Sequence, residues 1–106
     1  MLDTTPLTTA VDRFADRLRA APQSRLQRGA AARALGLARE LSVRAQRLES
    51  PGTEPRIMPD AGVFVVADQL TVAAGDLAEA LRTAPSEAEL DEAVRLVEKA
   101  VSEAAL

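Results

Sequence analysis

Hydrophobic residues recur every three or four positions along most of the chain, which is the spacing of one face of an α-helix. The most apolar stretch covers residues 60–81. At 100° per residue it has one continuous apolar face, made of Val63, Val66, Leu70, Ala73, Ala74, Leu77 and Leu81. A strand at 63–66 is the alternative, because valine and phenylalanine favour strands, but no second run in the chain can pair with it. The pattern therefore predicts a central helix over about 60–83.

Three further segments have the same periodicity and predict helices at about 6–21, 24–49 and 86–105. Each of the four predicted helices starts at a residue that can cap it: Thr5, Ser24, Asp60 and Ser86. The last start is the strongest, because Ser86 is followed three residues later by Glu89, as in a capping box. Pro22 either ends the first helix or kinks a continuous one, and the sequence leaves both open.

The one clear break in the pattern is residues 50–59, which contain three prolines and a Pro-Gly turn signal. This segment predicts a semi-rigid linker. Residues 1–106 are then a single all-α domain, an antiparallel four-helix bundle built from two helical hairpins joined by a Pro-rich linker. Two alternatives remain: long hairpins that associate between chains, and a three-helix form in which the first two helices merge through Pro22.

The amino-acid composition limits the catalytic and metal sites that the chain can form. The chain has no His, Cys, Trp or Tyr, which excludes nearly every nucleophilic triad and zinc site. No signal peptide and no membrane-spanning run is visible, so the expected location is cytoplasmic. The preference for arginine over lysine, with abundant alanine, suggests a GC-rich bacterial genome.

Carboxylates are the remaining candidates for catalysis. Asp76 with Glu79, and Glu89 with Glu92, lie on either side of the last predicted turn. If these four residues converged they could hold Mg²⁺, as in all-α nucleotide pyrophosphohydrolases. Glu89 is already used by the predicted cap, and no basic cluster nearby would bind phosphates. We therefore expect a solvated acidic corner, and we predict no catalytic, metal-binding or cofactor-binding residue and no cofactor.

Charge is distributed unevenly along the chain. Residues 1–50 contain nine arginines and five acids, whereas residues 51–106 contain four bases and eleven acids. The arginines at 25, 28, 39 and 47 spread over the outer half of the second helix and could contact phosphates, which keeps a nucleic-acid-binding regulator as an alternative. No aromatic stacking residue or helix-turn-helix spacing accompanies them, so nucleic acid is not the expected partner.

Two valines do not fit a simple outer face. Val65 and Val72 are seven residues apart on the polar side of the central helix, beside Asp68. Gly29 and Gly36, also seven apart, suggest that another helix passes close to the second helix. These five residues are the interface candidates. The predicted function is a non-enzymatic protein–protein interaction or adaptor module that acts as an oligomer, most simply a homodimer, and an additional, unidentified protein partner is left open.

Overall fold

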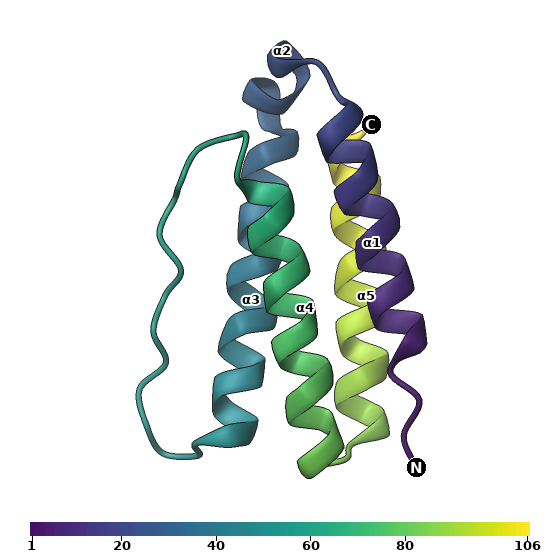
Figure 1. Cartoon of the computed structure of the whole chain (residues 1–106), viewed down its shortest axis with the longest axis vertical. Helices are drawn as coiled ribbons and strands as arrows, with labels where there is room; N and C mark the ends of the chain where they lie inside the picture. The colour runs from purple at the N-terminus through teal and green to yellow at the C-terminus, as the bar shows by residue number, and fades with distance from the viewer.

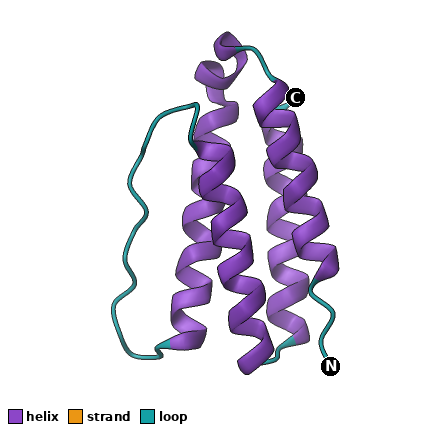
Figure 2. Cartoon of the chain, in the orientation of Figure 1, coloured by secondary structure: helices purple, strands orange, loops and turns teal.

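The computed structural model describes all 106 residues and contains four long helices around one apolar core (Figures 1 and 2). It has no strand, and the predicted all-α bundle is confirmed. The long helices are α1 (Thr5–Ala20), α3 (Ala31–Glu49), α4 (Val66–Thr83) and α5 (Glu87–Ala104). A short helix, α2 (Gln23–Arg25), and a kinked segment, η1 (Leu26–Ala30), in which Gly29 departs from helical geometry, precede α3.

The order of the helices around the bundle differs from two adjacent hairpins. The most extensive contact is between α3 and α4, and α1 contacts α4 and α5, while α5 also contacts α3. Long helices that follow each other in the sequence therefore lie across the diagonals of the bundle: α1 is diagonal to α3, and α4 is diagonal to α5. They are antiparallel, but the neighbours α3 and α4 run in the same direction, because residues 50–65 return along the whole bundle (Figure 1).

The core is formed by the faces that the periodicity predicts. All 27 buried residues are apolar, and no polar or charged residue is buried. The inward face of α4 is buried as expected, with only Val63, before the helix, partly exposed. The largest fully buried side chains are Phe14, Leu7, Leu18, Leu41, Leu70, Leu77 and Leu81. Burial of such side chains is the main stabilising term in a bundle of this size.

The return segment, residues 50–65, is held to the helices by side chains that bind its backbone. The Gln46 side chain donates to the Arg56 carbonyl at 2.8 Å and accepts from the Arg56 amide at 2.8 Å. Arg39 donates to the carbonyl of Met58 at 2.7 Å, and Gln69 donates to that of Pro59 at 2.9 Å. These bonds satisfy backbone groups that an extended segment cannot satisfy by itself.

The central helix begins later than its hydrophobic pattern predicts. It starts at Val66 and not at residue 60, because Asp60 caps a turn and not a helix: its Oδ1 accepts from the Gly62 amide at 2.9 Å. Gly62 then has φ of 96°, a left-handed conformation that a helix cannot continue through. The predicted linker is correspondingly longer, and Val63 to Val65 form a turn.

The other predicted helix starts have mixed outcomes. Ser86 does cap α5, since its Oγ accepts from the Glu89 amide at 3.1 Å. Ser24 and Thr5 cap nothing; α1 begins one residue earlier than predicted, and Asp3 accepts from the Thr5 amide at 3.0 Å. Pro22, with φ of −61° and ψ of 146°, separates α1 from α2, which excludes the three-helix alternative.

Candidate interaction surface

Three of the five exposed large apolar side chains lie just before α4 or in its first two turns. Phe64, Val65 and Val72 are 76%, 41% and 59% exposed, and we call these three residues the α4 patch. Val65 immediately precedes the helix and Val72 lies two turns later on the same side. The structure thus places both valines outside the core of their own chain, as expected for candidate interface residues.

Asp68 lies beside the patch but already has a partner in the same chain. The guanidinium of Arg19, on α1, donates to Asp68 Oδ1 at 2.8 Å. The hydrogen bond to Asp68 raises the pKa of Arg19, while slight desolvation opposes this effect. Both side chains are about half exposed or more, so this ion pair is screened by water and stabilises the fold weakly. Asp68, an interface candidate, therefore already has a counter-ion within its own chain.

The two candidate glycines lie on other elements than the α4 patch, Gly36 on α3 and Gly29 in η1. Gly36 is exposed on α3, beside a shallow groove that α5 helps to line, and no atom of the chain lies within 4 Å of the position its Cβ would occupy. No neighbouring helix packs directly against this position, so the close helix contact that the glycine spacing suggested is not made at Gly36 within one chain. Gly29 lies in η1 with φ of 153°, where it produces a kink and not a close helix contact.

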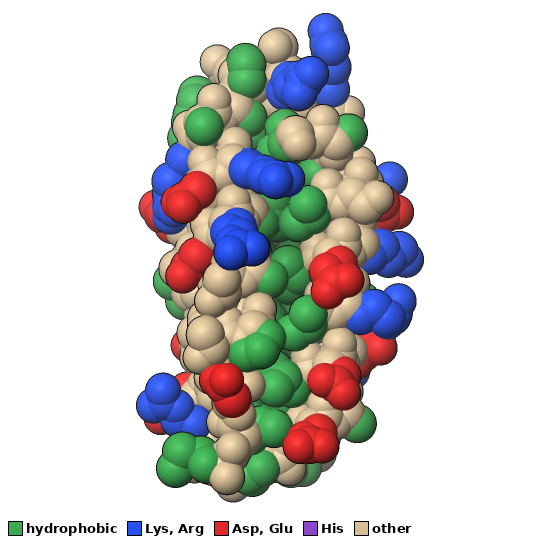
Figure 3. Space-filling view, turned by 90° about the vertical axis from the view of Figure 1, so that its right-hand side faces the viewer, with side chains coloured by type: hydrophobic (Ala, Val, Ile, Leu, Met, Phe, Trp, Pro, Cys, Tyr) green, Lys and Arg blue, Asp and Glu red, His purple; other side chains and the backbone are tan.

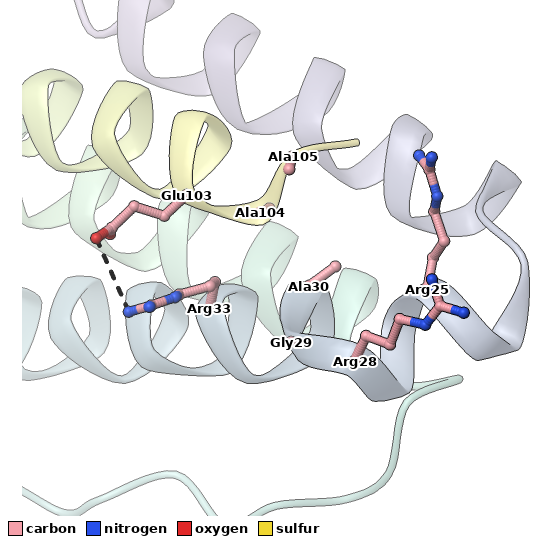
Figure 4. A pocket seen from close by; sticks show the side chains of 8 residues that line it. All are labelled: Arg25, Arg28, Gly29, Ala30, Arg33, Glu103, Ala104 and Ala105. Carbon is pink, nitrogen blue, oxygen red and sulfur yellow. Dashed lines mark ion pairs between the residues drawn. The ribbon is translucent and has the colours of Figure 1, made fainter.

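The kink at Gly29 brings arginines to one end of the bundle. Arg25, Arg28 and Arg33 line a hollow of about 350 Å³ together with Glu103 (Figure 4). Arg33 points toward Glu103, with a nitrogen–oxygen distance of 3.9 Å, whereas Arg25 and Arg28 extend away to the other side of Gly29 (Figure 4). The three guanidinium groups do not converge on one point, so this hollow is a basic surface and not a built anion site.

A second apolar feature follows the line between α1 and α5. Ala10, Phe14, Val97 and Val101 line a groove of about 350 Å³, whose rim carries Arg13, Arg17 and Glu98. Figure 3 shows hydrophobic side chains along one face of the bundle, flanked on both sides by basic and acidic groups. Phe14 is only 1% exposed, so the apolar floor of the groove is part of the core and offers little free surface.

Of the four acidic residues considered for Mg²⁺ binding, three are engaged separately and Asp76 has no ion-pair partner. Glu89 accepts from Arg44 at 2.8 Å, Glu79 pairs with Arg82 at 3.5 Å, and Glu92 pairs with Arg95. No group of three or more acidic side chains in the chain is close enough to hold a metal ion. The four carboxylates considered for Mg²⁺ are thus not gathered at one point in this structure.

A cleft next to the α4 patch was not predicted from the sequence. It has a volume of about 470 Å³ and lies between the start of α3, the end of the return segment and the first turn of α4. Its apolar lining comes mainly from Leu26, Leu35, Val63 and Val66, and its polar lining includes Arg39 and Asp60. The cleft lies where residues 60–65 form a turn and not the first turns of α4, which starts at Val66. The Asp60–Gly62 turn is therefore the sequence feature that could have predicted it.

No protein-family model matches the chain, and neither a curated protein nor a solved structure matches it significantly. None of the helices combines the length and the hydropathy that crossing a membrane requires.

Proposed function

We propose that this chain is a non-enzymatic protein–protein interaction module that self-associates as a homodimer through the α4 patch, in the cytoplasm. The observation that carries the proposal is the exposure of Phe64, Val65 and Val72 in the turn before α4 and the first two turns of that helix. Single exposed apolar residues are common, but a cluster of large ones is typical of an interaction surface. One of the three is an aromatic residue in a chain that has only two.

Energetics also support an interface at this face. Fully burying a valine contributes roughly 1.5–3 kcal/mol, and aromatic side chains are frequent anchors of interfaces. The exposed carboxylate of Asp76, one turn beyond Val72, has no ion-pair partner in the chain and could meet an arginine of a second copy. A small bundle whose core has few aromatics also gains stability from association.

The test is light scattering on the double variant Val65→Glu/Val72→Glu. The two introduced carboxylates would have to lose their hydration at the interface, which is costly. We therefore expect the double variant to be a folded monomer and the wild type to be a dimer. Ser102→Glu is the matched control, because Ser102 is exposed on α5 and should leave the dimer intact. A double variant that keeps the wild-type dimer overturns the proposal, as does a wild type that stays monomeric at high concentration.

A second candidate function is binding of nucleic acid at the arginine-rich end of the bundle. Arg25 and Arg28 are exposed and have no carboxylate partner, and positively charged surfaces of this kind attract phosphates. The test is retention on duplex DNA across a salt series, comparing the wild type with Arg25→Gln/Arg28→Gln. Salt-sensitive retention that the double variant lacks supports this candidate, and equal retention of both proteins opposes it.

A further inference from the structure

The position of Phe64 relative to the neighbouring cleft points to how two copies fit together. Phe64 precedes α4 in the turn formed by residues 63–65, and 76% of it is exposed. The residue before it, Val63, lines the cleft. Phe64 itself is not part of the lining, so each copy presents an exposed aromatic ring beside a cleft that this ring leaves open.

The cleft has the size and the chemistry to receive an aromatic ring. Its volume of about 470 Å³ lies within the range of roughly 300–1,000 Å³ found for sites that bind small molecules. Leu26, Leu35 and Val66 form its buried apolar floor and are only 3–8% exposed, whereas the partly exposed Ala31 and Val63 add apolar surface that a ring can reach. A ring that enters the cleft exchanges water for contacts with these side chains, which is the arrangement of an anchor residue in a pocket.

Charge in the cleft is complementary to a second copy of the same cleft. Arg39 and Asp60 both line it, yet neither forms an ion pair within the chain. Arg39 uses its Nε to donate to the carbonyl of Met58, and Asp60 accepts from the Gly62 amide. Under a two-fold axis Arg39 of each copy can face Asp60 of the other copy, so the same contact between opposite charges forms twice.

We propose that the partner at this surface is a second copy of the chain, bound about a two-fold axis, with Phe64 of each copy inserted into the cleft of the other and Arg39 facing the partner's Asp60. This inference rests on the proposed homodimer and adds its anchor, its pocket and its symmetry. Val65, beside Phe64, is then covered at the edge of the same contact.

The first experiment measures self-association of the full chain by sedimentation over a concentration series. Phe64→Ala should weaken the dimer by about tenfold or more, because an anchor is lost from its pocket. The side chain of Phe64 is exposed in the free chain, so the variant should keep the helical circular dichroism of the wild type. Arg47→Ala, at an exposed arginine of α3 that forms no ion pair, is the control and should leave the dimer unchanged.

The second experiment uses charge reversal to test the two-fold symmetry. Arg39→Glu places two acids opposite each other, Asp60→Arg places two bases opposite each other, and each variant alone should dissociate. Mixed together, the two variants should form a heterodimer, since one contact then joins the two substituted side chains, which have opposite charges, and the other contact retains the original Arg39–Asp60 pair. If either variant fails to fold, intermolecular nuclear Overhauser effects from Phe64 to the Leu35 and Val66 methyl groups in a mixed-label wild-type dimer decide the question.

The outcomes separate this inference from the proposed function. A wild-type monomer overturns both. A dimer that dissociates in Val65→Glu/Val72→Glu but is unaffected by Phe64→Ala leaves the proposed function standing and overturns the inference. Loss of the dimer in Phe64→Ala, with recovery in the mixture of the two charge variants, supports both.

Discussion

Gln46 binds the backbone of Arg56 with both ends of its side-chain amide. Its Nε2 donates to the Arg56 carbonyl and its Oε1 accepts from the Arg56 amide, each at 2.8 Å. The two residues lie ten positions apart, one on α3 and the other in the return segment. A planar amide that satisfies a donor and an acceptor of one residue replaces the pairing that a neighbouring strand would supply.

Gln46→Ala should therefore destabilise the fold by about 1–2 kcal/mol, because the two hydrogen bonds to Arg56 and the longer ones to Ser42 are lost while helix propensity hardly changes. Chemical denaturation measures the loss, and hydrogen exchange should show faster exchange of the Arg56 amide. Gln23→Ala is the control: Gln23 is exposed, and its side chain makes no hydrogen bond. If the two variants have the same stability, the Gln46 contact does not hold the return segment in solution.

Ser86→Ala should lower the free energy of unfolding by about 1 kcal/mol. The reason is that Ser86 Oγ accepts from the Glu89 amide at 3.1 Å, and this donor has no partner within the helix once the hydroxyl is removed. Ser102→Ala, on the exposed side of the same helix, should change the denaturation midpoint very little. Equal midpoints for the two variants would mean that the cap does not limit the stability of α5.

The inward faces of the helices could be predicted from sequence because burial follows a local period. Leu70 and Leu77 on α4, like Leu7 and Val11 on α1, are fully buried at the expected spacing. The end of α1 at Pro22 is equally local, since proline removes a donor and fixes φ. Such features depend on a few neighbouring residues and need no knowledge of the tertiary fold.

The start of α4 and the order of the helices could not be predicted in the same way. The apolar pattern continues back through Val63, but the Asp60–Gly62 turn interrupts the helix, so the pattern alone gives the wrong boundary. Hydrophobic periodicity also does not say which helix will cover a given face. The parallel packing of α3 against α4 requires the return segment to span the bundle, and side chains such as Arg39 and Gln46 fix its path only in the folded chain.

The same distinction applies to the candidate interface. Val65 and Val72 were identifiable because they interrupt a polar face, and they are exposed. Phe64 and its cleft depend on the turn before α4, so no periodic signal marks them. The interface itself stays a prediction.

Stability should fall in acid partly because of Asp3. Hydrogen bonds from Thr5 hold the pKa of Asp3 below its ordinary value, which is about 3.9 in model peptides. A carboxyl whose pKa is depressed by folding stabilises the fold above its unfolded pKa, and this contribution disappears as the pH falls through the folded pKa. Asp3→Asn keeps an acceptor oxygen but does not titrate, so its melting temperature should decline less than that of the wild type between about pH 5 and about pH 3. Parallel curves for the two proteins would show that the cap at Asp3 is not coupled to folding.

Gly29 and Gly36 should respond to alanine in opposite directions. At both positions an added Cβ meets no atom within 4 Å, so packing is not the difference between them. Gly36 has ordinary helical geometry within α3, where alanine is favoured by about 1 kcal/mol. Gly29 has φ of 153°, a conformation that side chains rarely adopt and that costs of order 1–3 kcal/mol in a residue other than glycine.

We therefore expect Gly36→Ala to raise the free energy of unfolding by about 0.5–1 kcal/mol and Gly29→Ala to lower it by about 1–3 kcal/mol. Urea denaturation of the two variants beside the wild type measures both changes. If Gly29→Ala is neutral or stabilising, α2 and α3 can form one straight helix and the kink is not intrinsic to the fold. If Gly36→Ala weakens the dimer instead of stabilising each chain, Gly36 belongs to a subunit contact, as its spacing in the sequence first suggested.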